Sequence, residues 1–149
     1  MGGTESAMST PGDGESAATR PDPIVSRDNA FFWEGALRGE LLGQACASCG
    51  ALRHPPRPMC PRCHGVERKQ VRLSGRGVVY SWIIPRHPAP VGFAEAPIVA
   101  LVELEEGIRL VSNVVGAAPG EVRQGLPVEV TFAPTRGGKA VPVFRPRRP

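Results

Sequence analysis

The sequence predicts a mainly β protein in which a short N-terminal helix and a rubredoxin-like zinc ribbon precede a five-stranded OB-fold barrel. Two observations carry this prediction. The only four cysteines form two C-x-x-C pairs within eighteen positions of one another, which is the ligand pattern of a closed, tetrahedral zinc site. From Gly75 onward, short runs rich in β-branched residues alternate with turn sequences, while 18 glycines and 17 prolines disfavour long helices.

Four segments are expected along the chain of 149 residues: a tail at 1–27, a helix at 28–40, the ribbon at 41–73 and the OB-fold domain at 74–149. The tail contains glycine, serine, alanine, proline and scattered charges but no aromatic residue. Such a composition buries too little apolar area to offset the entropy that is lost on ordering. We therefore predict that the tail is disordered.

The helix at 28–40 has recognisable ends, because Asp28 can cap its N-terminus and Gly39 can end it. Leu37 belongs to the apolar side that the pattern predicts. The helix also carries three consecutive aromatic residues, Phe31, Phe32 and Trp33. That is more than one side facing a core requires, so two interpretations stay open: packing on the zinc ribbon, or docking of some of these rings onto another chain.

The predicted metal ligands are Cys46, Cys49, Cys60 and Cys63. Two residues between the cysteines of each pair let both sulfurs face one ion, and Gly50 and Gly65 can take the positive φ that such tight turns need. The same site can hold iron, although zinc is the better match. Disulfides are disfavoured because no secretory signal precedes the cluster. Four thiolates leave no open coordination position, so the metal is expected to be structural.

Five strands are expected in the OB-fold domain: Gly77–Pro85, Pro97–Leu104, Ile108–Val115, Val128–Phe132 and Ala140–Phe144. Hairpin turns are expected at 105–107 and 135–138, where glycine follows polar residues. A five-stranded fragment of a β-sandwich is the alternative architecture. The closed barrel is preferred because closure removes the exposed strand edges.

No catalytic residue is predicted. All four cysteines are assigned to the metal, and the sequence lacks a nucleophile elbow, a metalloprotease motif, a dinucleotide-binding motif and a P-loop. His87, after the first barrel strand, is the histidine best placed to meet a ligand. Without a run of about 20 apolar residues or the apolar region of a signal peptide, we expect a cytoplasmic protein that makes no membrane contact.

Several stretches together carry a family resemblance: Phe32-Trp33-Glu34-Gly35, Cys46-Ala47-Ser48-Cys49-Gly50, Arg53-His54-Pro55-Pro56-Arg57, Cys60-Pro61-Arg62-Cys63, Gly75-Arg76-Gly77-Val78-Val79-Tyr80-Ser81-Trp82, Leu101-Val102-Glu103-Leu104-Glu105-Glu106-Gly107 and Gly125-Leu126-Pro127-Val128-Glu129-Val130. Over about residues 29–146 the chain resembles the zinc-ribbon plus OB-fold proteins associated with acyl-CoA, the DUF35 family. The resemblance implies a non-catalytic partner of thiolase-superfamily enzymes, including lipid-transfer-type thiolases and aldolases of steroid side-chain breakdown. Some members of the family are fused to a hydratase domain; the sequence shows none, so any hydratase is expected to be a separate subunit.

The resemblance further implies that the OB domain lies beside the partner's active site and helps to hold or channel a CoA thioester. CoA carries phosphates, which arginine binds in a bidentate manner. The candidate CoA and acyl-binding residues are Arg53, Arg57, Arg76, Arg86, Tyr80, Trp82 and Phe93. The alternatives are a solvated basic face for the arginines and the barrel core for the tyrosine and tryptophan. A pure scaffold that never touches CoA also stays open.

A nucleic-acid-binding module is the competing function, because OB barrels and basic zinc ribbons both occur in such proteins. That function needs aromatic side chains interleaved with basic ones on the barrel face. The expected barrel strands and turns carry acidic residues instead: Glu103, Glu105, Glu106 and Glu129. We therefore expect no nucleic-acid partner.

Overall fold

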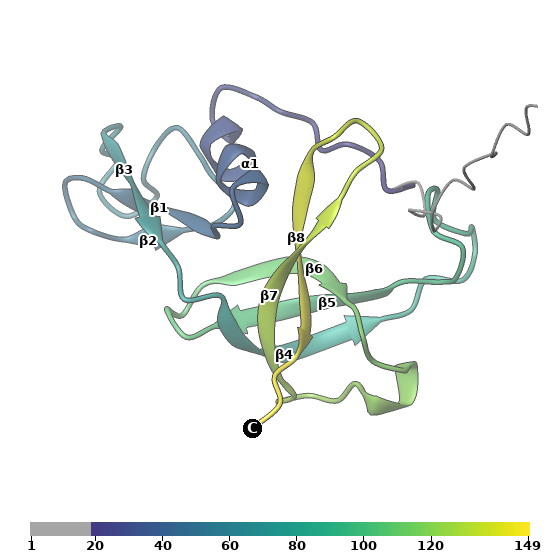
Figure 1. Cartoon of the computed structure of the whole chain (residues 1–149). Helices are drawn as coiled ribbons and strands as arrows, with labels where there is room; N and C mark the ends of the chain where they lie inside the picture. Colours follow the sequence, from purple (N-terminus) through teal and green to yellow (C-terminus); the bar gives the residue numbers. More distant parts are fainter. Residues whose placement is uncertain (1–18) are drawn as a thin grey trace, which may run out of the picture.

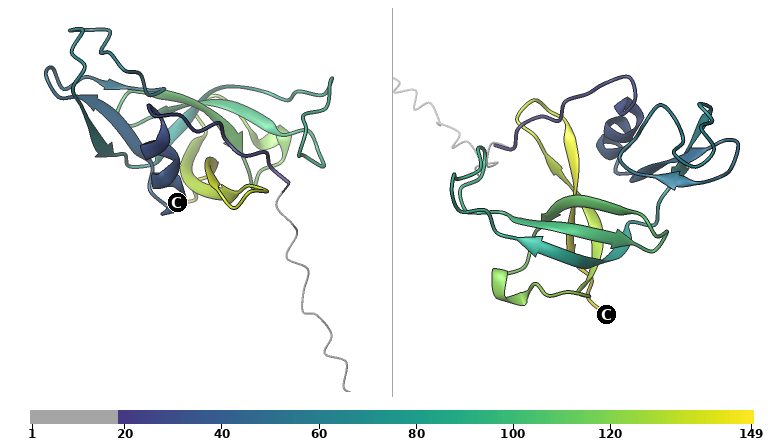
Figure 2. Two further views of the ribbon diagram at one scale, coloured as in Figure 1. Left: turned by 90° about the horizontal axis from the view of Figure 1, so that it is seen from above. Right: turned by 180° about the vertical axis from the view of Figure 1, so that it is seen from behind.

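The computed structural model describes residues 19–149. The α-helix of this part of the chain, α1, lies between a small three-stranded sheet and the β7–β8 hairpin of a barrel (Figure 1). The view from behind shows the same arrangement (Figure 2). None of the helices in the described part of the chain is long and apolar enough to span a membrane.

Helix α1 spans Ala30–Leu37 and is shorter than the helix expected at 28–40. Asn29, not Asp28, is the N-cap residue, and the Asp28 carboxylate instead accepts a hydrogen bond from Arg68 at 3.1 Å. Gly39 ends the helix with a φ of +78°, as predicted. The prediction that Leu37 belongs to the buried side is wrong, because its side chain is 61% exposed.

The aromatic residues of α1 connect the helix to both neighbouring parts. Phe32 is buried; its ring centroid lies 4.8 Å from that of Trp33 and 5.3 Å from that of His54 in the ribbon. Phe32 also belongs to the core cluster that contains the interior of the barrel, and Phe31 and Trp33 pack against this cluster while half-buried. The packing interpretation therefore holds for Phe32, because its buried ring has no free surface that another chain could contact.

The ribbon sheet has the strand order β2-β1-β3, with bounds Leu52–Arg53, Leu42–Cys46 and Arg68–Arg72. Both pairings are antiparallel, and every residue of the central strand β1 is buried. The small size of this sheet means that its apolar area alone gives little stability. A metal ion held by the four cysteines would supply much of the rest.

The barrel consists of β4 (Arg76–Ile83), β5 (Ile98–Leu104), β6 (Arg109–Val114), β7 (Pro127–Pro134) and β8 (Ala140–Pro146). These strands close in the order β4-β5-β6-β8-β7, with β6 and β8 parallel and every other pair antiparallel. A 3₁₀ turn, η1, stands between β6 and β7. The prediction of a closed five-stranded OB barrel is confirmed, and the sandwich alternative is excluded.

The interior of the barrel is filled by side chains from all five strands, including Leu110 and Val114 of β6. Val79, Val102, Val128 and Phe144 are fully buried there. The register of β4 against β5 shifts between Val79 and Ser81. Tyr80 is the residue of this bulge that has no partner in β5, and it is exposed, whereas the preceding Val79 is fully buried.

The end of the expected tail is ordered. Residues 19–27 form an extended segment, which runs from α1 past the β7–β8 hairpin to the loop between β4 and β5 (Figure 1). Thr19, Arg20 and Asp22 all form hydrogen bonds with the barrel. The prediction of disorder is therefore wrong for 19–27, because specific polar contacts replace the missing apolar area. Residues 1–18 lie outside the described part of the chain.

Candidate functional site

The four cysteines of the predicted ligand set form one compact cluster. Their Sγ atoms all lie within 4.8 Å of one another, with Cys46 and Cys63 separated by 3.5 Å and Cys49 and Cys60 by 3.7 Å. Four sulfurs at this spacing, with no carboxylate or imidazole among them, fit a closed site for Zn²⁺. The ion would be held by these four thiolates and would cross-link the ribbon.

Each cysteine pair is followed by a residue in the left-handed conformation. Gly50 has a φ of +74° and donates its N–H to the Cys46 carbonyl at 2.9 Å; His64 has a φ of +61° and donates equivalently to Cys60, also at 2.9 Å. The expectation of a positive φ is correct for Gly50 and wrong for Gly65. A Cβ on Gly65 would lie 3.2 Å from the Cys63 Sγ, so glycine is needed there for close approach to the sulfurs.

Backbone N–H groups favour the thiolate form of the first cysteine in each pair. The N–H groups of Cys49 and Ser48 lower the pKa of Cys46 to about 6. The N–H groups of Cys63 and Arg62 lower the pKa of Cys60 in the same way. Thiolates stabilised in this manner are suitable ligands for a metal cation.

Cys63 behaves differently. The Gly65 N–H lowers its pKa, but the hydrogen bond that it shares with the Cys46 sulfur and its removal from solvent together raise the pKa to about 11. The protonated form of Cys63 is therefore favoured where the thiolate forms of Cys46 and Cys60 are favoured. A bound cation would displace that proton and complete the four-thiolate set.

Arg53 holds the ribbon together instead of facing solvent. Its side chain is buried, and its Nε donates to Gln44 Oε1 at 2.8 Å while its Nη2 donates to the Arg57 carbonyl at 3.2 Å. The Arg57 backbone N–H donates to the same Gln44 oxygen at 2.8 Å. Arg53 Nη1 is the one guanidinium nitrogen that is buried without a hydrogen-bond partner among residues 19–149. The side chain of Arg57 is exposed.

Arg76 is committed to an ion pair. Its Nε and Nη2 donate to the two carboxylate oxygens of Glu105 at 3.0 and 2.9 Å. The Arg76 guanidinium holds the pKa of Glu105 below its ordinary value. A phosphate would have to compete with this carboxylate.

Tyr80 and Trp82 are 40% and 37% exposed, so the barrel-core alternative is wrong for both. The guanidinium of Arg109 lies 3.7 Å from the centroid of the Tyr80 ring, and its Nε donates to Glu103 at 2.7 Å. Sequence reasoning missed Arg109. The turn expected at 105–107 carried the signal, because that hairpin places Arg109 directly opposite Glu103.

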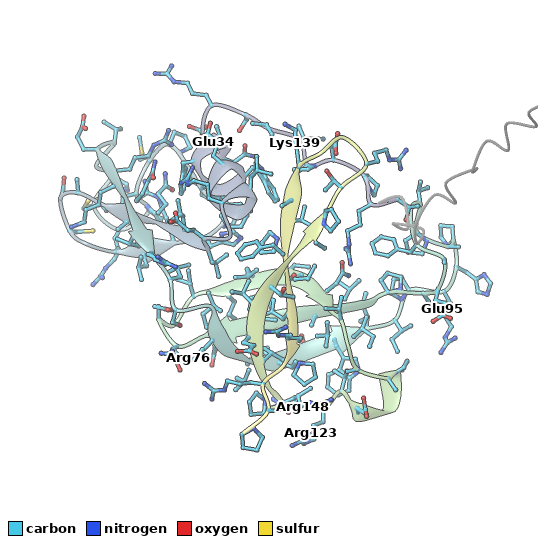
Figure 3. The ribbon with its side chains drawn as sticks, in the orientation of Figure 1. Glu34, Arg76, Glu95, Arg123, Lys139 and Arg148 are labelled. Carbon is cyan, nitrogen blue, oxygen red and sulfur yellow. The ribbon has the colours of Figure 1, made fainter. Side chains whose placement is uncertain are left out.

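A groove of about 470 Å³ separates the ribbon from the barrel. It is lined by Arg53 and Arg57 from the ribbon and by Arg109 from the barrel, together with Leu52, His54, Pro55, Pro61, Glu103, Gly107 and Ile108. Arg86 and Phe93 line a different cavity of about 290 Å³, in the loop between β4 and β5. Arg76 and Glu95, the latter from that loop, lie at opposite ends of the barrel in Figure 3. The seven candidate residues therefore do not form one site.

The outer surface of β4, β5 and β6 carries an apolar patch, which we call the apolar sheet face: Ile83, Val99, Leu101 and Val111. Strand register places Ile83 opposite Val99 and Leu101 opposite Val111, so all four share one face. Ile83 is 64% and Val111 69% exposed. Contiguous exposed apolar side chains of this kind mark interaction surfaces. Sequence reasoning did not single out this face.

Two family models match the two parts of the chain. One, described as the rubredoxin-like zinc ribbon domain of ChsH2, matches residues 33–67; the other, described as the C-terminal OB-fold domain of ChsH2, matches residues 70–133. A solved structure described as an Ltp2-ChsH2(DUF35) aldolase is 45% identical, with a TM-score of 0.76, and the match covers 84% of this chain and 98% of that chain. The chain belongs to the DUF35 family.

Two curated relatives show the range of proteins that this DUF35 chain resembles. The probable enoyl-CoA hydratase alpha subunit of Thermomonospora curvata is 46% identical over 132 residues, which are 89% of this chain but 41% of that protein. The DUF35 chain thus spans less than half the length of this relative. The benzoylsuccinyl-CoA thiolase subunit BbsA of Thauera aromatica is 32% identical over 124 residues, covering 78% of this chain and 85% of that subunit.

Proposed function

We propose that this DUF35 chain is a non-catalytic accessory subunit that binds a thiolase-superfamily enzyme, either a thiolase or a retro-aldolase that acts on an acyl-CoA. The descriptions of its relatives as a thiolase subunit, a hydratase subunit and part of an aldolase support this class of partner. Steroid side-chain degradation is the pathway that the family resemblance favours.

The observation that carries the proposal is the apolar sheet face. Ile83 and Val111 leave about two thirds of their surface in water, which is unfavourable unless a partner covers them. Phe31 and Trp33, half-buried on α1, are proposed as secondary contacts, whereas Phe32 is no longer proposed because it is buried.

A pull-down tests the partner. The chain would be co-expressed with a thiolase-like protein encoded beside it, and complex formation would be followed by size-exclusion chromatography. Glutamate at Ile83 or Val111 is expected to abolish co-elution without changing the thermal midpoint of the isolated chain. Val66→Glu is the matched control, because Val66 is 61% exposed but lies in the ribbon. A complex that survives I83E and V111E together would contradict this assignment.

For the CoA thioester we propose the groove between ribbon and barrel, with the exposed Arg57 and with Arg109 as the phosphate ligands. A phosphate would compete with Glu103 for Arg109. Tyr80, which stacks with Arg109, would border the path of the pantetheine arm. Arg76, Arg86, Trp82 and Phe93 are not part of this groove.

Binding of CoA to the purified complex, measured by titration calorimetry, tests the proposed CoA site in the groove. Arg57→Ala and Arg109→Ala are each expected to weaken binding by roughly tenfold or more, because a hydrogen bond to a charged group contributes about 1.5–3 kcal/mol. Arg123→Ala is the control, since that exposed arginine lies outside the groove. Unchanged affinity in both groove variants would leave the chain as a scaffold that does not touch CoA.

A further inference from the structure

The N-terminal segment lies where OB barrels in general bind their ligands. That site is formed by the second and third barrel strands together with the loops that join strands one to two and four to five. Here these are β5, β6, the loop at 84–97 and the hairpin loop at 135–139. Residues 19–22, which we call the N-terminal strap, run between the two loops; Glu95 and Lys139 mark the loops in Figure 3.

The first half of the strap contacts β6 and the loop at 84–97. The Thr19 hydroxyl donates to the Gly92 carbonyl at 2.7 Å. The Arg20 guanidinium lies 4.8 Å from the centroid of the Phe93 ring and donates to Asn113 Oδ1 at 2.5 Å. One arginine side chain thus uses both a cation–π contact and a charge-assisted hydrogen bond.

The second half contacts the hairpin loop. The Arg136 N–H donates to the Arg20 carbonyl at 2.9 Å. The Asp22 carboxylate accepts hydrogen bonds from the hydroxyl of Thr135, whose side chain is buried, and from the N–H of Gly137 at 2.9 Å. The strap is therefore recognised through its main chain, one cation and one anion.

Both loops have a glycine where the strap passes. A Cβ on Gly92 would lie 2.5 Å from the Thr19 carbonyl oxygen, and a Cβ on Gly137 would collide with the Asp22 carboxylate. Beneath the strap lies a cavity of about 240 Å³, lined in part by Trp33, Phe93 and Val111. These features describe a groove shaped for an extended chain.

We infer that the groove between the loops at 84–97 and 135–139 is a binding site for an extended peptide in which an arginine stands two residues before an aspartate, and that residues 19–22 are its displaceable occupant within the same chain. A segment of a partner protein with the same chemistry would compete with the strap. The groove shares Trp33 and Val111 with the proposed partner surface, but binding of the peptide to the isolated chain is measured without the thiolase partner or CoA.

The test uses a fluorescein-labelled peptide with the sequence of residues 19–26 and the full chain carrying Arg20→Ala and Asp22→Ala together. Fluorescence anisotropy is expected to show saturable binding to this variant and at least tenfold weaker binding to the wild-type chain, whose groove is occupied. A peptide with Asp22→Asn is expected to bind at least tenfold more weakly than the wild-type peptide. Ile24→Ala in the full chain is the control, because Ile24 is 89% exposed.

Deletion of residues 1–22 provides a second form of the experiment, with zinc content and the thermal midpoint as checks of folding. Equal binding of the peptide to the wild-type chain and the double variant would overturn the inference. Equal affinity of the wild-type peptide and the Asp22→Asn peptide would also overturn it, since recognition would then not use the carboxylate. Failure of the folded double variant to bind the peptide would have the same consequence.

Discussion

His64 shows at the scale of one residue how the ribbon tolerates local strain. It occupies, after the second cysteine pair, the place that Gly50 occupies after the first, and both are left-handed. That conformation costs a residue with a Cβ roughly 1–2 kcal/mol and costs glycine much less. The two cysteine pairs are thus geometrically equivalent but differ in backbone strain.

The turns at Gly50 and His64 are expected to respond differently to substitution in their free energy of unfolding. His64→Gly is expected to be about 1 kcal/mol more stable than His64→Ala, whereas Gly50→Ala is expected to lose about 1 kcal/mol. Urea unfolding of the zinc-loaded protein measures both differences. If His64→Ala equals or exceeds His64→Gly in stability, the left-handed conformation is not the cause of strain.

Arg53 and Arg57 are separated by three residues but have different roles. Arg53→Met should destabilise the ribbon by about 2 kcal/mol, because Gln44 Oε1 loses a charged donor inside the protein. Arg57→Ala should change stability by less than about 0.5 kcal/mol, because Arg57 contacts Gln44 through its backbone N–H. Chemical denaturation of the two variants would separate the roles, and equal losses would contradict them.

Asp22 makes the strap sensitive to acid. Hydrogen bonds from Thr135 and Gly137, with the nearby charges of Lys139 and Arg136, hold the pKa of Asp22 below its ordinary value of 3.8. A carboxylate with a depressed pKa stabilises the bound strap at pH values above 3.8, and this contribution is lost as pH falls through the lower, bound-state pKa.

Fluorescence of Trp33, which lines the cavity beneath the strap, provides the measurement in a Trp82→Phe background. We expect a change below about pH 4 that is absent when Asp22 is replaced by asparagine. A transition of the same size in both proteins would assign it to other groups, such as the cysteine cluster.

The ribbon shows at the scale of an element how a metal can substitute for a core. Its sheet is small, and the four sulfurs lie at one end of it. Removing zinc with a chelator, or changing Cys60 to serine, is expected to unfold the ribbon. The thermal midpoint should fall by roughly 10 °C or more, since structural zinc contributes many kcal/mol. Circular dichroism melting with and without chelator measures this, and an unchanged midpoint would contradict a structural metal.

The elements were predicted well where local sequence determines them. All five barrel strands lie within about two residues of their expected bounds, because β-branched runs and glycine turns are local features. The strap was missed because composition predicts apolar burial and not polar contacts such as those of Thr135 and Asn113 with a segment more than ninety positions away. The bulge at Tyr80 also has no local marker in the sequence.

At the scale of the whole molecule, the candidate site divides into a predictable and an unpredictable part. The metal ligands follow from the spacing of Cys46, Cys49, Cys60 and Cys63 alone. Arginines are harder to assign, because their partners come from distant strands: Arg76 pairs with Glu105, and Arg109 stacks on Tyr80. The sequence shows that the ribbon is rich in basic residues, but only the tertiary structure shows which arginines line the groove and can bind an anion.

The position of Phe32 has a consequence for anyone who exchanges parts between members of this family. Its ring touches the ribbon through His54 and belongs to the cluster that fills the barrel, so the helix is the joint between the two. A chimaera that carries this ribbon and barrel but lacks residues 30–37 would have a cavity in its core where the Phe32 ring packs. The natural unit for grafting therefore begins at Ala30, three residues before the point where the zinc-ribbon family model starts.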